Sequence, residues 1–120
     1  MQDFRKIIAW QKSHALTLAV YKATEHFPIH ELYGLTSQMR RSASSVPTNI
    51  AEGCGRDGKA ELKRFLSIAM GSASELQYQL ILANDLDYLP DANFQQLDND
   101  VREVKRLLGG FIRSLSNPKN

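Results

Sequence analysis

The stretch that decides the fold is LKRFLSIAMGSASELQYQLILA, residues 62–83. Apolar or small side chains recur in it at alternating steps of four and three, the spacing of a heptad seam on an α-helix. The seam consists of Leu62, Leu66, Ala69, Ala73, Leu76, Leu80 and Ala83. A second apolar face carries Phe65, Ile68, Leu82 and Leu86. We therefore expect one long helix with more packing surface than two bundle neighbours require. The small residues from Gly71 to Ser74 would allow another backbone to approach closely.

The segments on either side extend the helical pattern. After Leu89-Pro90 the heptad spacing returns with Phe94, Leu97, Val101, Val104, Leu108, Phe111 and Leu115. Near the start of the chain, one stripe contains Phe4, Ile8, Gln11, Ala15, Leu18 and Lys22. We predict helices over about residues 3–26, 34–53, 57–88 and 91–115, with Asp3 capping the first. No segment alternates as a strand would. The prediction is an all-α, antiparallel, up-down-up-down four-helix bundle as a single domain over residues 1–116, followed by a disordered tail, 117–120.

The second predicted helix contains a proline. Its inner stripe is formed by Leu35, Met39, Ser42, Ala43, Val46 and Ile50. Pro47 lies inside this helix, where it removes the hydrogen bond that the Ala43 carbonyl would otherwise accept. We expect the helix to kink or restart there, with Ser44 and Ser45 as donors to the freed carbonyls.

Composition limits the classes of protein that the chain can represent. It has 120 residues, 42% of them hydrophobic, and a formal net charge of +2. Cys54 is the single cysteine, which excludes an internal disulfide framework and favours a reducing compartment. The charged N-terminal segment does not resemble a signal peptide, and no run approaches the roughly 20 apolar residues of a membrane span. We expect a cytoplasmic protein without a membrane partner.

The motif GCGRDGKA, residues 53–60, imitates a nucleotide-binding loop. It satisfies G-x-G-x-x-G and lies one residue away from the phosphate-loop pattern, because Ala60 replaces the hydroxyl residue that would hold Mg²⁺. Both motifs need a preceding strand, and this one follows a helical segment. We interpret it as a turn between two helices. Gly53 or Gly55 would end the second helix in a left-handed cap, and Asp57 would cap the third.

Basic residues concentrate around that turn. Residues 40–64 contain six cations, Arg40, Arg41, Arg56, Lys59, Lys63 and Arg64, against the acids Glu52, Asp57 and Glu61. The last four cations, with the free amides of the third helix, are candidates for binding the phosphates of a polymer. In the second helix, Arg41, Ser45, Thr48 and Glu52 share one stripe. That stripe either contacts phosphates or forms a polar seam in a subunit contact.

Other chemistry has little support. Pro28 separates His26 from His30, and no partnering Cys or carboxylate cluster suggests a metal site. Cys54 has no nearby histidine to activate it, and no triad or carboxylate pair stands out. Trp10 either stacks on a base or packs against a helix. We predict no catalytic residues, metal, cofactor or small-molecule substrate.

Several motifs resemble one known family. They are Leu35-x-x-Gln38-x-x-Arg41, then Ser45-Val46-Pro47-x-Asn49-Ile50-Ala51-Glu52-Gly53, then Arg56, and finally Phe65-Leu66-x-Ile68-Ala69-x-Gly71-Ser72-x-x-Glu75-Leu76. This pattern resembles the four-helix bundle proteins encoded in 23S rRNA intervening sequences of bacteria. One departure is Met70, where the family often carries arginine.

The resemblance implies a left-handed bundle that assembles as a ring-like homopentamer. It also implies structural roles for Pro47, Asn49, Glu52, Gly53, Phe65, Gly71, Ser72 and Glu75. The accessory proteins of diversity-generating retroelements look similar in fold, and those pentamers carry a basic surface and bind nucleic acid together with a reverse transcriptase. No catalytic site is established for the family.

Two functions follow as hypotheses. The first is a non-enzymatic oligomeric protein that binds nucleic acid, structured RNA above all, through its basic surface. The second is a protein–protein scaffold without a nucleic-acid role. It is motivated by the surplus of apolar surface and by an acidic patch of Asp85, Asp87, Asp91, Asp98 and Asp100.

Overall fold

The computed structural model describes residues 2–116, and within them the chain forms helices without any strand. The four α-helices are α1 (Ile8–Thr24), α2 (Leu35–Cys54), α3 (Lys59–Asp85) and α4 (Asp91–Ser116). A short 3-10 helix, η1 (Phe4–Lys6), precedes α1, and a second, η2 (Ile29–Glu31), lies between α1 and α2. The predicted all-α class is confirmed. The predicted tail, residues 117–120, lies outside the described residues.

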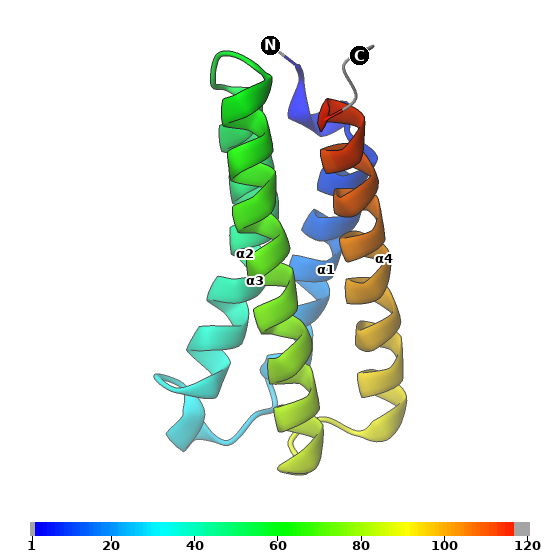
Figure 1. The fold of residues 1–120 in the computed structure, drawn as a ribbon. Helices are drawn as coiled ribbons and strands as arrows, with labels where there is room; N and C mark the ends of the chain where they lie inside the picture. Colours follow the sequence, from blue (N-terminus) through cyan, green and yellow to red (C-terminus); the bar gives the residue numbers. More distant parts are fainter. Residues whose placement is uncertain (1, 117–120) are drawn as a thin grey trace.

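The helices surround one core. Figure 1 shows the chain reversing direction at each connection, and the molecule is 48 Å long. Each helix packs on its two neighbours, α1 on α2, α2 on α3, α3 on α4 and α4 back on α1, whereas the diagonal pairs stay apart throughout residues 2–116. The α2–α3 connection lies at the same end as the start of α1 and the end of α4. The other two connections lie at the opposite end.

The heptad seams of α3 and α4 form half of this core. Every predicted seam residue of α3, from Leu62 to Ala83, is buried. In α4 the central positions Leu97, Val101, Val104 and Leu108 are buried, and the outer ones pack against the core while partly exposed. Removal of these side chains from water is the main favourable contribution to folding. The two predicted seams are confirmed.

The stripe noted in the first helix does not face the core. Ile8 and Leu18 are 58% and 59% exposed, whereas the buried side chains of α1 are Ala9, Ser13, Leu16, Thr17, Val20 and Thr24. Three of these carry hydroxyls that hydrogen-bond to backbone carbonyl oxygens. A hydroxyl satisfied in this way can be buried without the cost of an unpaired polar group. The inner face of α1 is therefore small and partly polar, and simple hydropathy does not mark it.

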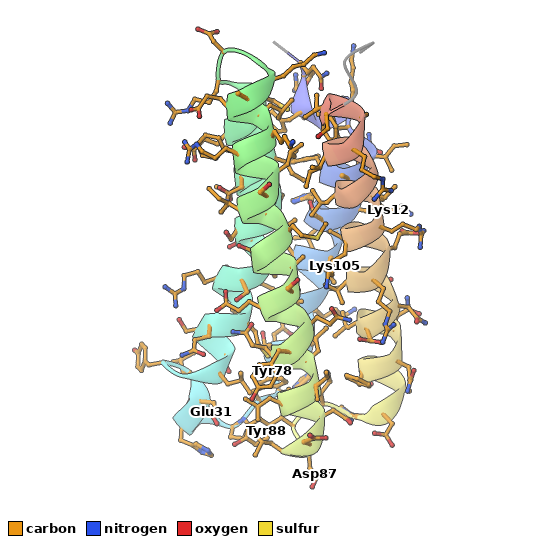
Figure 2. The ribbon with its side chains drawn as sticks, viewed as in Figure 1. Lys12, Glu31, Tyr78, Asp87, Tyr88 and Lys105 are labelled. Carbon is orange, nitrogen blue, oxygen red and sulfur yellow. The ribbon has the colours of Figure 1, made fainter. Side chains whose placement is uncertain are left out.

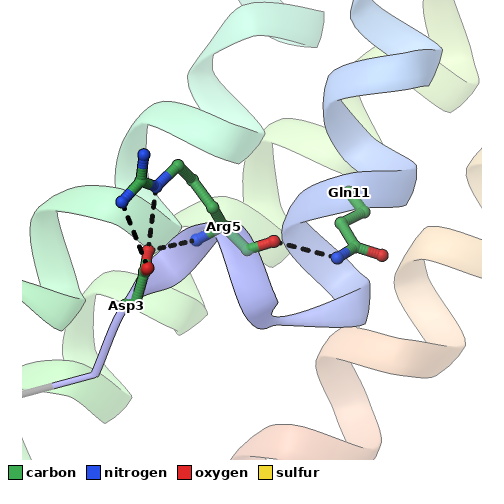
Figure 3. A network of polar contacts seen from close by, with 3 residues as sticks. All are labelled: Asp3, Arg5 and Gln11. Atoms are coloured by element: carbon green, nitrogen blue, oxygen red, sulfur yellow. Dashed lines mark hydrogen bonds and ion pairs between the residues drawn. The ribbon is translucent and has the colours of Figure 1, made fainter.

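The first predicted helix, 3–26, is also divided. Ile7 has extended angles, φ −86° and ψ 124°, and separates η1 from α1. Asp3 caps η1, because its Oδ1 accepts hydrogen bonds from the backbone N and the Nε of Arg5, both at 3.1 Å. The Gln11 amide donates to the Arg5 carbonyl at 2.9 Å (Figure 3). The Gln11 bond thus connects η1 to α1.

The turn between α2 and α3 differs from the prediction in its caps. Gly53 lies inside α2, and Gly55, which ends it, has a right-handed φ of −85°. The left-handed conformation occurs instead at Gly58, with φ 85°, directly before α3. Asp57 makes no capping bond, because α3 begins at Lys59 with Gly58 as its N-cap. The predicted left-handed cap on α2 and the predicted Asp57 cap on α3 are therefore both wrong. The interpretation of this segment as a turn between two helices is confirmed.

α2 passes through Pro47 as one helix. Ser44 and Ser45, the expected donors, do not reach the freed Ala43 carbonyl. The Ser44 hydroxyl donates to the Arg41 carbonyl, and the Ser45 hydroxyl contacts Ser72. The donor comes from α1, where the Thr17 hydroxyl lies 3.0 Å from the Ala43 oxygen.

Candidate nucleic-acid interface

A polar seam joins α2 to α3 along one face of the bundle. The hydroxyl oxygens of Ser45 and Ser72 are 2.9 Å apart. The Asn49 amide donates to the Ser45 carbonyl at 2.7 Å and to its hydroxyl at 3.0 Å. Three of the residues in the resemblance motifs thus form one hydrogen-bonded chain between two helices. Their role within the chain is to hold α2 and α3 in register.

The same seam continues to the α2–α3 turn through a close backbone contact. A Cβ on Gly53 would lie 2.9 Å from the Cβ of Phe65 and 3.0 Å from Cδ1 of Leu62, which is closer than real Cβ atoms come. Glycine at position 53 therefore allows α3 to pack directly on α2. Phe65 is buried beneath this contact.

Two of the predicted cations cover Phe65. The guanidinium carbons of Arg64 and Arg56 lie 4.5 Å and 5.3 Å from the centre of its ring, at cation–π distance. Arg56 also pairs with Glu52 at 3.2 Å, and Arg64 pairs with Glu61 at 2.9 Å. The hydrogen bond from Arg64 lowers the pKa of Glu61, and the same contact raises the pKa of Arg64. Half the positive charge at this turn is therefore offset by neighbouring carboxylates.

Three predicted cations remain free of such contacts. Arg41, Lys59 and Lys63 are exposed, and none makes a side-chain hydrogen bond or an ion pair within residues 2–116. Lys59 and Lys63 lie in the first two turns of α3, where the free backbone amides add partial positive charge. Arg41 lies 13 residues before the end of α2, or about 20 Å along the helix. Of the six predicted residues, these three are the ones available to an external anion.

Arg40 makes its contacts with α1. Its Nε donates to the Thr24 hydroxyl at 2.9 Å and its Nη2 to the Tyr21 carbonyl at 3.4 Å, both in α1. Its guanidinium carbon lies 4.9 Å from the centre of the Tyr21 ring. The six cations therefore do not form one patch, because Arg40 is fixed between α1 and α2.

The remaining motif residues have different surroundings. Glu52 acts through its pair with Arg56, and Pro47 is buried in α2. Glu75 is exposed and, with Arg41, Ser42, Ser45 and Ser72, lines a surface cavity of about 240 Å³. Gly71 is exposed, and nothing lies within 4 Å of where its Cβ would be. Packing within the chain therefore does not require glycine at position 71.

The acidic residues do not gather in one place. Asp85, Asp87 and Asp91 lie around the α3–α4 connection. Asp98 is buried and pairs with Arg102 at 2.8 Å, whereas Asp100 accepts a bond from Gln96. At the same end of the bundle as that connection, Glu31 and Tyr88 meet across the two connections (Figure 2). Asp98 is therefore not exposed as part of the predicted acidic patch.

No arrangement for metal or thiol chemistry occurs in the described chain. Residues 2–116 contain no group of three or more His, Cys, Asp or Glu side chains that could hold a metal ion. Cys54 is buried, and burial raises the pKa of its thiol, which disfavours the reactive thiolate. The Trp10 ring contacts the rings of Phe4 and His14, whose centres lie 5.1 Å and 5.0 Å from its own. Of the two roles predicted for Trp10, these contacts agree with packing inside the protein.

Several candidate side chains were not predicted from the sequence. Lys6 and Arg113 are exposed at the end of the bundle that carries Lys59 and Lys63. Tyr21 and Tyr33 are 44% and 93% exposed and lie near Arg40 and Arg41 in an open hollow. The charges of Lys6 and Arg113 were visible in the sequence, but their position depends on the fold. For the two tyrosines, no pattern in the amino-acid sequence indicates whether the ring is exposed or buried.

The fold and the seam define a small four-helix protein with an apolar core and a polar contact between α2 and α3. The sequence profile of the 23S rRNA-intervening sequence protein family matches residues 5–110, and the chain belongs to that family. A similar solved structure is the crystal structure of a protein of unknown function from the S23 ribosomal protein family of Bacteroides thetaiotaomicron. The two sequences are 25% identical, and the two structures superpose with a TM-score of 0.77. The match covers 88% of this chain and 98% of the other. The comparison with curated proteins finds no match.

These findings confirm the family resemblance. They leave the predicted assembly, the nucleic-acid partner and the absence of catalysis as predictions. For the membrane, no helix within residues 2–116 has both the length and the apolar character needed to cross a bilayer.

Proposed function

We propose that this protein is a non-enzymatic, oligomeric nucleic-acid-binding protein that contacts RNA through exposed cations of α2 and α3. The observation that carries the proposal is the exposure of Arg41, Lys59 and Lys63 without any partner within residues 2–116. An exposed cation that stabilises nothing within its own chain is available to neutralise a phosphate. The family's link to 23S rRNA agrees with RNA as the polymer.

Oligomerisation would strengthen such weak contacts. We propose an antiparallel, left-handed bundle that forms a ring of five copies in the cytoplasm. The exposed apolar side chains on the outer faces of α1 and α3 support an interface between copies: Ile8, Leu18, Ile68, Tyr78, Ile81 and Leu86. Repetition of these exposed cations around a ring increases avidity without any new contact.

The binding proposal is tested by RNA affinity over a series of salt concentrations. We expect affinity to fall linearly on a log–log plot, because each neutralised phosphate releases counterions. The double variant Lys59→Glu, Lys63→Glu should bind more weakly and with a shallower slope, by about one unit per lost contact. Lys22→Glu is the matched control, since Lys22 is exposed on α1 and also lacks a partner among the described residues. No binding at low salt, or affinity independent of salt, contradicts the proposal.

The assembly is tested separately by native mass spectrometry of protein purified with and without nuclease. Five copies are expected in both samples, with bound nucleic acid only in the untreated one. A monomer in both samples contradicts the ring. The scaffold hypothesis predicts instead that a protein partner is retained after nuclease treatment.

A further inference from the structure

An open hollow lies beside the α1–α2 connection, about 20 Å from the turn that carries Lys59 and Lys63. Its volume is about 470 Å³, and most of it is open to solvent. Tyr21, Leu32 and Tyr33 supply its apolar lining. Arg40, Arg41, Ser37 and Ser44 supply its polar groups. We call it the Tyr33 hollow.

Tyr33 is the unusual member of this set. Its side chain is 93% exposed, so the ring contributes almost nothing to the core. Tyr21 is 44% exposed on the neighbouring helix. Exposed aromatic faces beside cations are the feature with which proteins hold unstacked bases, because every base has a face that can stack.

The wall of the hollow that contains Arg40 is preorganised. Two hydrogen bonds to α1 fix the Arg40 guanidinium, and its carbon lies 4.9 Å from the centre of the Tyr21 ring. A planar guanidinium held in this way is itself a surface on which a base stacks. Because Arg40 is already ordered in the free protein, little conformational entropy is lost at this wall when a ligand binds.

Arg41 supplies the contact that Arg40 cannot make. It lines the Tyr33 hollow and has no partner within residues 2–116. It also lines the small cavity over the Ser45–Ser72 contact, so it lies between the hollow and the α2–α3 seam. A base in the hollow would bring its phosphate near Arg41.

We propose that the Tyr33 hollow binds one unpaired base of an RNA strand, stacked on Tyr33, with Arg41 on the adjoining phosphate. This inference rests on the proposed RNA binding and names the part of the RNA that is recognised. Bases within a duplex are already stacked on each other, and their faces are inaccessible. The protein therefore prefers single-stranded RNA, or loops and bulges, to a continuous duplex.

The test compares Tyr33→Ala and Tyr33→Phe with the unchanged protein. The probes are a short single-stranded oligonucleotide that contains a fluorescent adenine analogue, and a fully paired RNA duplex. We expect Tyr33→Ala to lower single-strand affinity about tenfold and to abolish the quenching of the analogue, while Tyr33→Phe keeps both. Duplex affinity should be weaker and equal in all three proteins. Ile29→Ala, which truncates an 84% exposed side chain of η2 that does not line the hollow, is the control and should behave as the unchanged protein.

The outcomes separate the inference from the proposal on which it rests. If single-stranded RNA binds with the same affinity and quenching after Tyr33→Ala, the hollow does not hold a base, although RNA binding stands. Equal affinity of the unchanged protein for duplex and single strand also overturns the inference. Retention of a protein partner that depends on Tyr33, with RNA affinity unaffected, assigns the hollow to a protein and overturns it. If no RNA binds at any salt concentration, both ideas fail.

Discussion

The hydroxyl of Thr17 in α1 lies 3.0 Å from the carbonyl oxygen of Ala43 in α2. Ala43 is four residues before Pro47, whose ring nitrogen has no hydrogen to donate to it. The same hydroxyl lies 2.8 Å from the Ser13 carbonyl of its own helix, so its single hydrogen is shared between two acceptors. Thr17 is 8% exposed, and water has little access to this contact. A side chain of α1 thus replaces the backbone bond that α2 lacks.

Thr17→Val should therefore destabilise the protein. Valine keeps the shape of threonine but leaves the Ala43 carbonyl buried without a donor, which costs about 1–3 kcal/mol. The measurement is the free energy of unfolding in urea. Pro47→Ala supplies an N–H to Ala43, so the penalty of Thr17→Val should be smaller in that background. An equal penalty in both backgrounds would show that the Thr17–Ala43 bond is not what stabilises α2 here.

The buried faces of the four helices differed in how well the sequence predicted them. The seams of α3 and α4 could be predicted because bulky apolar residues such as Leu66, Leu76 and Val101 repeat at heptad spacing. The inner face of α1 could not, because Ser13, Thr17 and Thr24 are buried through hydrogen bonds to carbonyls that no hydropathy pattern reveals. The stripe that contains Ile8 and Leu18 does not mark that inner face, since both side chains are exposed in the single chain.

The candidate interface was predictable as a list of cations but not as a surface. Arg40 and Arg41 are adjacent in sequence, yet Arg40 is fixed by Thr24 whereas Arg41 has no partner in the described chain. Only the packing of α1 against α2 separates them. The same holds for Arg64, which Glu61 and Phe65 engage, and Lys63, which no described residue engages. A charge count cannot distinguish a cation that stabilises its own fold from one available to a ligand.

Gly53→Ala should strongly destabilise the α2–α3 contact. The added methyl group would lie 2.9 Å from the Phe65 Cβ and 3.0 Å from Leu62 Cδ1, so α3 must move away from α2. Overpacking of this kind costs about 1–3 kcal/mol. Denaturant unfolding measures the loss. A variant as stable as the unchanged protein would mean that the two helices separate there without cost.

Glu31 should make stability depend on pH under acidic conditions. Its carboxylate accepts hydrogen bonds from the Leu35 backbone N–H at 3.2 Å and from the Tyr88 hydroxyl at 3.0 Å, and these contacts, the Leu35 bond foremost, lower its pKa below the ordinary value of 4.5. A lowered folded-state pKa means that the stabilisation is complete above about pH 4.5 and disappears as the pH falls through the folded-state value.

Glu31→Gln tests this dependence through thermal midpoints measured at several pH values. The variant should melt below the unchanged protein near neutral pH, and the difference should narrow as the pH falls below about 4.5. Tyr88→Phe removes one hydrogen bond to Glu31 but retains the Leu35 bond. Its thermal midpoint should therefore fall less on acidification than that of the unchanged protein, and in the same direction. A constant difference between Glu31→Gln and the unchanged protein across this range would exclude the carboxylate as its source.

Gly71→Ala separates a requirement of the chain from a requirement of the assembly. Within the chain, Gly71 lies mid-helix in α3 with nothing within 4 Å of the added Cβ, so alanine should raise helix stability by about 0.8–1 kcal/mol. If subunits pack closely over Gly71, the same methyl group obstructs their contact. We expect the variant to remain folded and to dissociate at higher protein concentration than the unchanged ring, as measured by native mass spectrometry. Unchanged assembly, together with the gain in stability, would place the subunit contact away from Gly71.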